Sequence, residues 1–458
     1  MHGAPRELLT LLRREPRMRL VLGTVAQSSI GTGAAYVALL LIAYDRWESP
    51  WAISLILFAE FAPAMLLGPL LGAVADRWSR RTCAVTADVA RVAAFAGVAV
   101  VDGFAATFVF ALLAGTGTAL FRPAMLAALP GLVRRESLPA ATSAYGAVTD
   151  AGYVLGPALA AGLLAVMGPE LVVAANGATF GLSALVLLSL RFGEVESHAD
   201  TAVSLLDDVR EGILVLRRQR AVAVLIALGG AAMISGGLFN VIELPFAEDE
   251  LGAGDSGYSL LVATYGIGFL VGSLAGASGG RPALLKRRFI QGLAITGLAG
   301  LATAATQGLG LALVTFLLCG FGNGLFATYQ RLIIQSEIPG SLHGRVFSLD
   351  DAVSSWALAL ALLAGGVLTS IADLRVLMAA TGVWELALAL VAVAVLRGHW
   401  RTRPAALSSA GGDGIAQAHF GEQHPHVVGG TALWLGILDD LDQGRDDRGI
   451  ELRPGVGL

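Results

Sequence analysis

Charged residues are scarce in this sequence. Asp, Glu, Lys and Arg make up 14% of its 458 residues, whereas hydrophobic residues make up 55%. Soluble domains usually carry about 25% charged residues, and the mean hydropathy of this chain is +0.70. The composition excludes an ordinary soluble protein and indicates a chain that lies in a membrane.

Cysteine is scarcer still, since Cys83 and Cys319 are the only two. Two cysteines beside or within apolar runs cannot build a disulfide framework or a zinc cluster, so we expect no metal site. The net charge of -4 gives no reason to expect a nucleic-acid partner. The sequence also has no Walker-type loop, no H-E-x-x-H motif and no dinucleotide-binding glycine pattern. We therefore expect neither an enzyme nor a primary pump, and no cofactor.

Long apolar runs are abundant, and each has the length that crosses a bilayer as a helix. They predict an all-α integral membrane protein of twelve transmembrane helices in two six-helix bundles. The expected spans are 19–42, 51–75, 82–101, 104–126, 143–167 and 170–190, then 221–246, 257–280, 288–306, 309–330, 350–371 and 374–396. The expected segments are a cytoplasmic N-terminus (1–18), an N-terminal bundle (19–190), a cytoplasmic linker with an amphipathic helix (191–220), a C-terminal bundle (221–396) and a largely disordered cytoplasmic tail (397–458).

The basic residues predict the orientation of the chain. Among the 31 Lys and Arg residues, Arg46 and Arg375 fall on one side of the predicted membrane, and Arg91 and Arg122 fall inside spans. All the others lie on the side of the N-terminus. Because cytoplasmic loops are enriched in Lys and Arg, both termini are expected in the cytoplasm and the chain in the cell inner (plasma) membrane. The first apolar run is too long for a signal peptide and should stay as a helix.

Glycine spacing indicates an internal repeat. Gly68 and Gly72 close the second span, Gly272 and Gly276 close the eighth, and both pairs differ by the same shift along the chain. That shift also moves the start of the first span to the start of the seventh. Two six-helix units in tandem are therefore expected, with the substrate cavity between them near the bilayer midplane.

A charged motif joins the second and third spans. The stretch GPLLGAVADRWSRR at 68–81 places Asp76 and three arginines in a very short loop. Such a clamp can bind a neighbouring helix terminus in one conformation and release it in another. Anchoring on the cytoplasmic side would explain the arginines but not Asp76.

This motif resembles the G-x-x-x-D-R-x-x-R-R signature of the major facilitator superfamily, although Ser79 replaces a usual glycine. The matching residues are Gly72, Asp76, Arg77, Arg80 and Arg81. The equivalent stretch of the second half has Gly280 in place of the acid, so a weaker second clamp is expected.

The fifth span carries GYVLGPALAAG, in which Gly152, Gly156 and Pro157 resemble the helix-5 signature of the superfamily's antiporters. General close packing of membrane helices would use the same residue types. Residues 121–141 and 335–348 look like the macrolide-efflux and enterobactin-exporter branch. The resemblance implies proton-driven export. We expect the substrate to be a small amphipathic molecule, drug-like or siderophore-like, and the transporter to be a monomer in the lipid bilayer.

Ionisable side chains inside the spans each cost about 2.5–3.5 kcal/mol, so each needs a partner, a water-filled cavity or a function. Glu60 has no local counter-charge, and we expect it to bind a proton or a cationic substrate. Asp88 and Arg91 lie three residues apart and should form a structural pair. The remaining candidates for a proton or substrate site are Arg122, Asp150, Asn240 and Glu243.

Three smaller expectations concern the second half and the function. Glu385 lies within the twelfth span, and Asp350 and Asp351 should cap the eleventh helix, because Ser348 and Asp351 have capping-box spacing. An importer or uniporter of a polar metabolite is the alternative function, and its candidate polar partners are Asn176, Asn240, Asn323 and Gln330. A sensor or scaffold that kept the fold without transport is a third possibility, against which the Asp76 clamp argues.

Overall fold

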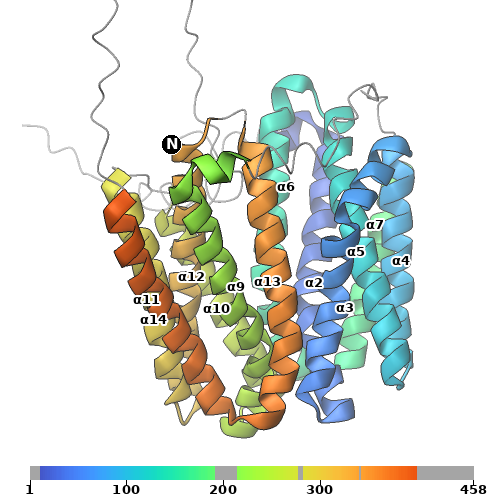
Figure 1. The fold of residues 1–458 in the computed structure, drawn as a ribbon. Coiled ribbons are helices and arrows are strands. Elements are labelled where there is room, and N and C mark those ends of the chain that lie inside the picture. The colour runs from blue at the N-terminus through green and yellow to red at the C-terminus, as the bar shows by residue number, and fades with distance from the viewer. Residues whose placement is uncertain (1–10, 191–213, 277–281, 340–341, 400–458) are drawn as a thin grey trace, which may run out of the picture.

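Twelve long helices dominate the part of the chain that the computed structural model describes, residues 11–190, 214–276, 282–339 and 342–399 (Figure 1). The first six, which we call the N-terminal half, are α2 (Pro16–Trp47), α3 (Pro50–Arg77), α4 (Arg80–Val100), α5 (Phe104–Leu132), α6 (Leu138–Leu164) and α7 (Pro169–Ser189). The C-terminal half comprises α9 (Arg220–Pro245), α10 (Gly254–Gly276), α11 (Pro282–Ala304), α12 (Leu309–Glu337), α13 (His343–Ile371) and α14 (Leu374–His399). Two single turns, η1 (Arg135–Ser137) and η2 (Phe246–Glu250), precede α6 and extend α9.

The helices have the length and surface of membrane spans. Eleven of those in the described residues are long and apolar enough to cross a bilayer, and α11 is the twelfth by its place in the packing. Several helices begin with proline at the first position, where its missing N–H costs nothing, as at Pro16, Pro50 and Pro169. Large apolar side chains point outward, as in Leu185 and Leu390, which are 66% and 70% exposed. The all-α membrane fold predicted from the sequence is confirmed.

The two halves repeat one packing pattern. In the N-terminal half α2 packs on α6 and α7, α4 packs on α5 and α7, and α3 packs on α5. In the C-terminal half α9 packs on α13 and α14, α11 packs on α12 and α14, and α10 packs on α12. Each of these contacts in one half therefore has its counterpart in the other. The main contacts between the halves, α6 with α10 and α3 with α13, are also related by this repeat.

One end of the molecule is closed across the two halves. A single buried apolar cluster there contains residues of both, for example Ala38 and Ile53 with Leu244 and Phe316. This end, where α2 is followed by α3, is called the closed end below.

Polar and ring contacts reinforce the closed end. Ser54 of α3 donates a hydrogen bond to the carbonyl of Leu362 in α13. The Trp51 ring lies against Gly366 so closely that a Cβ atom on the glycine would be 2.7 Å from it. The Tyr44 hydroxyl donates to Asp249 Oδ2 at 2.5 Å. Each contact joins an element of one half to an element of the other.

At the opposite end the cores of the two halves are separate. One buried cluster contains only residues of the N-terminal half, such as Met18 and Met125. The other contains only residues of the C-terminal half, such as Phe289 and Ile334. The halves therefore meet through a shared core at the closed end and diverge toward the other, which we call the open end.

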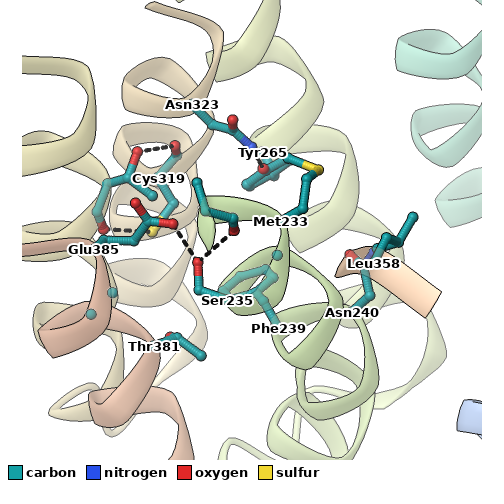
Figure 2. A pocket seen from close by; sticks show the side chains of 15 residues that line it. Met233, Ser235, Phe239, Asn240, Tyr265, Cys319, Asn323, Leu358, Thr381 and Glu385 are labelled. Atoms are coloured by element: carbon teal, nitrogen blue, oxygen red, sulfur yellow. Dashed lines mark hydrogen bonds between the residues drawn. The ribbon is translucent and has the colours of Figure 1, made fainter. Parts of the chain in front are cut away.

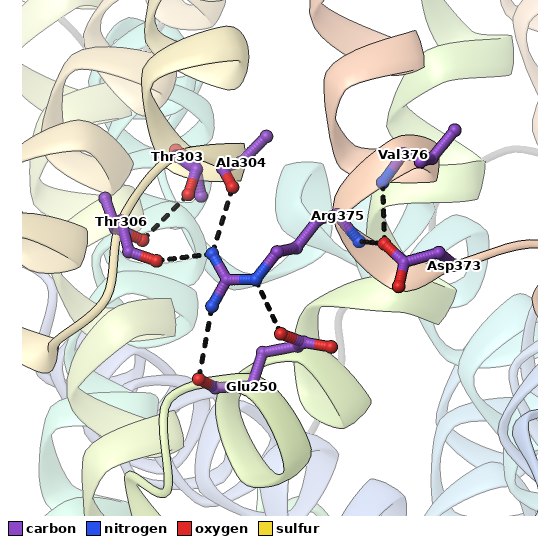
Figure 3. Close-up of polar contacts among 7 residues, drawn as sticks. All are labelled: Glu250, Thr303, Ala304, Thr306, Asp373, Arg375 and Val376. Atoms are coloured by element: carbon purple, nitrogen blue, oxygen red, sulfur yellow. Dashed lines mark hydrogen bonds and ion pairs between the residues drawn. The ribbon is translucent and has the colours of Figure 1, made fainter.

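The two arginines that the sequence places apart from the other basic residues each bind their own half together at the closed end. Arg46 donates to Glu170 at 3.1 Å and to the carbonyl of Val101, which joins α2 to α7 and to the end of α4. Arg375 donates to Glu250 at 2.6 Å and to two carbonyls near the end of α11 (Figure 3). These contacts give both arginines a structural role where basic residues are otherwise rare.

The predicted helix cap at Asp350 and Asp351 is wrong. Helix α13 begins at His343, so both aspartates lie inside it. Ser348 donates to the carbonyl of Gly344 instead of capping a terminus. Asp350 is buried and accepts a hydrogen bond from Gln330 at 2.9 Å. Ser348 and Asp351 have the capping-box spacing but lie inside the helix. The prediction failed because this spacing alone does not show where a helix begins.

Some predictions fall outside the described residues. These are most of the proposed amphipathic linker (191–213), the position of Gly280 and the tail from 400 onward. The proposed segment boundaries at 190 and 221 therefore stay predictions.

Candidate functional site

The charged motif is more helical than expected. Helix α3 continues to Arg77 and α4 starts at Arg80, so Asp76 and Arg77 belong to the last turn of α3 and only two residues separate the helices. Ser79 caps α4, since its hydroxyl accepts a hydrogen bond from the Thr82 N–H at 3.4 Å. This gives a local reason for serine at the position where the signature that the motif resembles usually has glycine.

One arginine of the motif binds the end of a neighbouring helix. Arg81 donates to the carbonyl of Leu188 in the last turn of α7. The last carbonyls of a helix lack partners within it and carry the negative end of the helix dipole. Arg81 therefore fastens the start of α4 to the end of α7. Arg80 is the first residue of α4. Gly72 of α3 is not in a close helix contact, since a Cβ atom there would meet nothing within 4 Å.

The antiporter-like residues of α6 form a close contact with α2. A Cβ atom on Gly156 would lie 2.5 Å from the Gly33 Cα atom, and one on Gly152 would lie 2.3 Å from the Ser29 Cβ atom. A Cβ atom on Gly33 would in turn lie 3.2 Å from Pro157 Cδ. Small residues thus let the backbones of two helices of the N-terminal half touch. In this conformation the motif serves packing.

Asp88 and Arg91 form the expected pair, and it is fully enclosed. Arg91 donates to Asp88 Oδ1; Arg91 is 5% exposed and Asp88 is 0% exposed. The guanidinium carbon lies 4.1 Å from the centroid of the Phe121 ring and 4.0 Å from that of Phe180. Gly117 leaves room for the arginine stem, because a Cβ atom there would be 2.7 Å from Arg91 Cγ. The pair is neutralised within the N-terminal half and needs no substrate.

Replacing Asp88 with asparagine should destabilise the protein, because the Arg91 charge would stay buried without its carboxylate. Breaking one side of a buried pair typically costs about 3–5 kcal/mol. We expect a lower thermal unfolding midpoint in detergent. The double variant Asp88→Asn/Arg91→Met removes both charges and should recover part of the loss. A double variant that is no more stable than the single one would contradict the structural role.

Glu60 lies midway along α3 at its contact with α5. Its backbone carbonyl is so close to Gly115 that a Cβ atom there would be 2.2 Å from the oxygen. Its side-chain Oε2 atom is buried and has no hydrogen-bond partner among the described residues. Tyr36 of α2 interacts electrostatically with Glu60 and also with Glu243 of the C-terminal half. Glu60 is thus an unpaired acid close to the junction of the halves.

The structure separates the two candidates on α9. Glu243 is 5% exposed and accepts a hydrogen bond from the Tyr258 hydroxyl of α10 at 3.1 Å. Asn240 lines a cavity inside the C-terminal half. Asn240 and Glu243 are three residues apart on α9, but their side chains do not lie at one site.

Arg122 and Asp150 are exposed toward the open end. Asp150 of α6 interacts electrostatically with Arg331 of α12 and with Arg122 of α5. This loose group of charges spans the two halves without a direct ion pair among the described residues.

Two of the four polar residues weighed for a metabolite site line a cavity in the C-terminal half, and two do not. Asn323 donates to the Tyr265 hydroxyl at that cavity, which Asn240 also lines. The side-chain amide of Gln330 donates a hydrogen bond to Asp350 Oδ1. Asn176 is buried in the N-terminal half, where its Nδ2 atom has no partner among the described residues.

Glu385, for which the sequence indicates no particular role, also lines that cavity (Figure 2). It is 5% exposed, and Ser235 of α9 donates to its Oε1 atom. Its Oε2 atom is buried without a partner among the described residues. An acid near the middle of the twelfth span was the available signal.

Comparison with known proteins identifies the family. The family model of the Major Facilitator Superfamily matches residues 21–351. The multidrug efflux pump Tap of Mycolicibacterium fortuitum is 28% identical over 401 residues, which cover 84% of this chain and 97% of that protein. Macrolide efflux protein A of Streptococcus pyogenes is 22% identical over 349 residues, covering 74% and 85%.

Solved structures share the fold. A bacterial homologue of the human lysosomal transporter Spinster, in an inward-facing and unoccupied conformation, has a TM-score of 0.65 at 16% identity and covers 84% of this chain and 99% of that one. The nucleoside transporter NupG has a TM-score of 0.63 at 13% identity, covering 83% and 99%. The relatives are transporters and not enzymes. With the two repeated halves and the family match over most of its length, the chain belongs to the major facilitator superfamily.

Proposed function

We propose that the protein is a proton-coupled exporter that moves a small amphipathic molecule, drug-like or siderophore-like, out of the cell by alternating access. Relatives that act as a macrolide efflux protein and a multidrug efflux pump support the direction of transport. The exporter works as a monomer in the inner membrane. Its direct partners are the substrate, protons and lipid.

The distribution of basic residues supports the orientation. The closed end carries Arg46 and Arg375, each held by its own half, whereas the other loops that the sequence predicts to be basic lie at the open end. Under the positive-inside rule the open end is cytoplasmic, with both termini. The protein is then closed to the outside and open toward the cytoplasm, in the conformation that would receive a substrate for export.

The observation that carries the proposal is the unpaired Glu60 beside the junction of the halves. An ionised carboxylate there would have one oxygen buried without a partner among the described residues, which is costly in a membrane. A proton taken up from one side and released to the other would neutralise it in one of the two conformations. Tyr36 interacts electrostatically with both this acid and Glu243, so both halves contribute polar groups to the same region.

Replacing Glu60 with glutamine should abolish substrate-induced proton movement, because the amide cannot exchange a proton. The measurement uses proteoliposomes with an imposed pH gradient, and it screens macrolides, dyes and siderophores. Glu60→Asp keeps a carboxyl group and should retain coupling. Glu136→Gln changes an exposed acid of η1 and controls for the loss of a charge. Full proton coupling in Glu60→Gln across pH 6 to 8 would remove the proposed role.

A uniporter of a polar metabolite is the second candidate function. The cavity lined by Asn240 and Asn323 favours it, since fixed amides suit a polar substrate. Facilitated movement of such a metabolite without proton flux, in the same proteoliposomes, would support this function over export.

A further inference from the structure

A cavity of about 200 Å³ lies inside the C-terminal half, away from the junction at Glu60. All six helices of that half contribute to its wall. Figure 2 shows Glu385 and Cys319 on one side of the cavity, with Tyr265, Met233 and Phe239 around it. Asn240 and Leu358 lie on the opposite side from Glu385, nearest the ribbons of the N-terminal half.

The carboxylate of Glu385 is only half satisfied. Ser235 donates to Oε1, but the same hydroxyl also lies 2.9 Å from the carbonyl of Ala232, so one proton serves two acceptors. Oε2 is buried and receives no hydrogen bond from any described residue. No arginine, lysine or histidine is among the residues that line the cavity in the described chain.

Asp88 in the N-terminal half is a buried acid with a different environment. Asp88 is neutralised by Arg91, whose guanidinium is held between two phenylalanine rings. Glu385 has aromatic neighbours of the same kind, with the rings of Phe239 and Tyr265 stacked 5.9 Å apart, but no cation. A carboxylate with aromatic rings nearby and no cation is the complement of a positively charged group. The cation would therefore come from a ligand.

The size and lining of the cavity select the kind of cation. No group of three or more His, Cys, Asp or Glu that could hold a metal ion occurs among the described residues. A volume of about 200 Å³ is several times the roughly 30 Å³ share of one water molecule. It is smaller than the roughly 300–1,000 Å³ of pockets that enclose a whole drug-sized ligand. The cavity fits an alkylammonium head group with a short apolar part.

We propose that this cavity binds the ammonium group of an organic cation, with Glu385 as its counter-ion and Phe239 and Tyr265 as its aromatic wall. The proposal rests on the proposed export function and narrows its substrate class to amphipathic amines. The head group lies inside the C-terminal half. The rest of a larger substrate extends past Asn240 and Leu358 toward the other half.

The test is equilibrium binding to the purified full-length protein in detergent, measured by isothermal titration calorimetry. The probes are 2-phenylethylamine and its neutral counterpart 2-phenylethanol. The amine should bind wild type more tightly than the alcohol. Glu385→Gln should weaken amine binding by at least about tenfold, because the amide keeps the shape of the side chain and loses the negative charge that pairs with the ammonium group. The affinity for the alcohol should change little.

A second variant fills the cavity and keeps the charge. Gly236 lines the cavity, and a Cβ atom there would meet nothing within 4 Å, so a side chain can enter without displacing a helix. Gly236→Leu should reduce the binding of both probes. Glu385→Asp, which retains the carboxylate, should keep the preference for the amine. Thermal unfolding of each variant shows whether it is folded.

Equal binding of amine and alcohol to wild type would overturn the proposal. Amine binding that survives both Glu385→Gln and Gly236→Leu would overturn it as well. Because these measurements use no gradient, they are independent of proton coupling through Glu60. A failed binding test with intact proton-coupled export would leave the proposed function standing, and the reverse result would leave an amine site in a protein that is not a proton-coupled exporter.

Discussion

Replacing Gly272 with alanine should lower the thermal stability of the protein, whereas the same change at Gly68 should not. A Cβ atom on Gly272 would lie 2.1 Å from the backbone carbonyl of Phe321, so α10 and α12 would have to separate. Forcing extra atoms into a packed interior costs about 1–3 kcal/mol. A Cβ atom on Gly68 would meet nothing within 4 Å.

The contact at Gly272 is one of four that join α10 and α12. Gly268 and Gly272 of α10 face carbonyls of α12, and Gly320 and Gly324 of α12 face carbonyls of α10, all at 2.0–2.1 Å from the position of a Cβ atom. Each helix thus carries a G-x-x-x-G pair, the spacing that lets membrane helices touch through their backbones. Alanine at any one of the four should open the contact, and two together should act more strongly.

Thermal unfolding in detergent can be followed with a thiol-reactive fluorescent dye, since Cys83 and Cys319 are both buried and react when the protein opens. The matched control is Gly68→Ala, a change of the same size at the α3 glycine that the sequence spacing aligned with Gly272, and one whose Cβ atom would meet nothing within 4 Å. An equal drop in midpoint for the two variants would show that the α10–α12 contact does not set the result, because alanine by itself favours the helix over glycine.

This comparison also shows what the repeat in the sequence predicted and what it did not. The shift that relates Gly68 and Gly72 to Gly272 and Gly276 correctly indicated two tandem units, and the packing of the helices repeats throughout. It did not predict that the glycines differ in environment. Gly272 packs against the Phe321 carbonyl of α12, whereas Gly68 has open space beside it.

A closer equivalence emerges only from the structure. The carbonyl of Glu60 lies against Gly115 of α5, and the carbonyl of Tyr265 lies against Gly320 of α12. These two contacts occupy the same place in the α3–α5 and α10–α12 pairs. Tyr265 is therefore the counterpart of Glu60, and the acid of one half corresponds to a phenol in the other. Glycine spacing in the sequence could not align these positions. In each contact a glycine meets the backbone oxygen of its partner, so the side chain of the partner, Glu60 or Tyr265, does not contribute to the pattern.

The candidate site was predicted unevenly. An acid inside a span is costly wherever it lies, so the sequence could single out Glu60, Asp88 and Glu243. Which of them has a partner depends on other helices. Asp88 pairs with Arg91 on its own helix, as their three-residue spacing predicts. No role for Glu385 could be predicted, because its hydroxyl partner and the cavity come from helices far away in the chain.

A disulfide across the closed end should stop transport. If the protein exports by alternating access, the contact between α3 and α13 at that end must separate to release the substrate. A Cβ atom on Gly366 would lie 3.0 Å from the Ser54 Cβ atom, close to the roughly 3.5–4.5 Å between the Cβ atoms of a disulfide. Ser54→Cys/Gly366→Cys should therefore cross-link once the Trp51 ring, 2.7 Å from the same Cβ position, moves aside.

The experiment uses a background in which Cys83 and Cys319 are replaced by alanine, so that only the engineered pair can react. Oxidation should reduce export to the level of empty vesicles, and a reducing agent should restore the rate of the reduced double variant. That rate is the proper reference, because Ser54→Cys also removes the hydrogen bond to Leu362. Each single cysteine variant should be indifferent to oxidant. Export that continues at full rate with the disulfide shown to be formed would mean that the substrate leaves by a route that does not open this end, and alternating access between these halves would have to be abandoned.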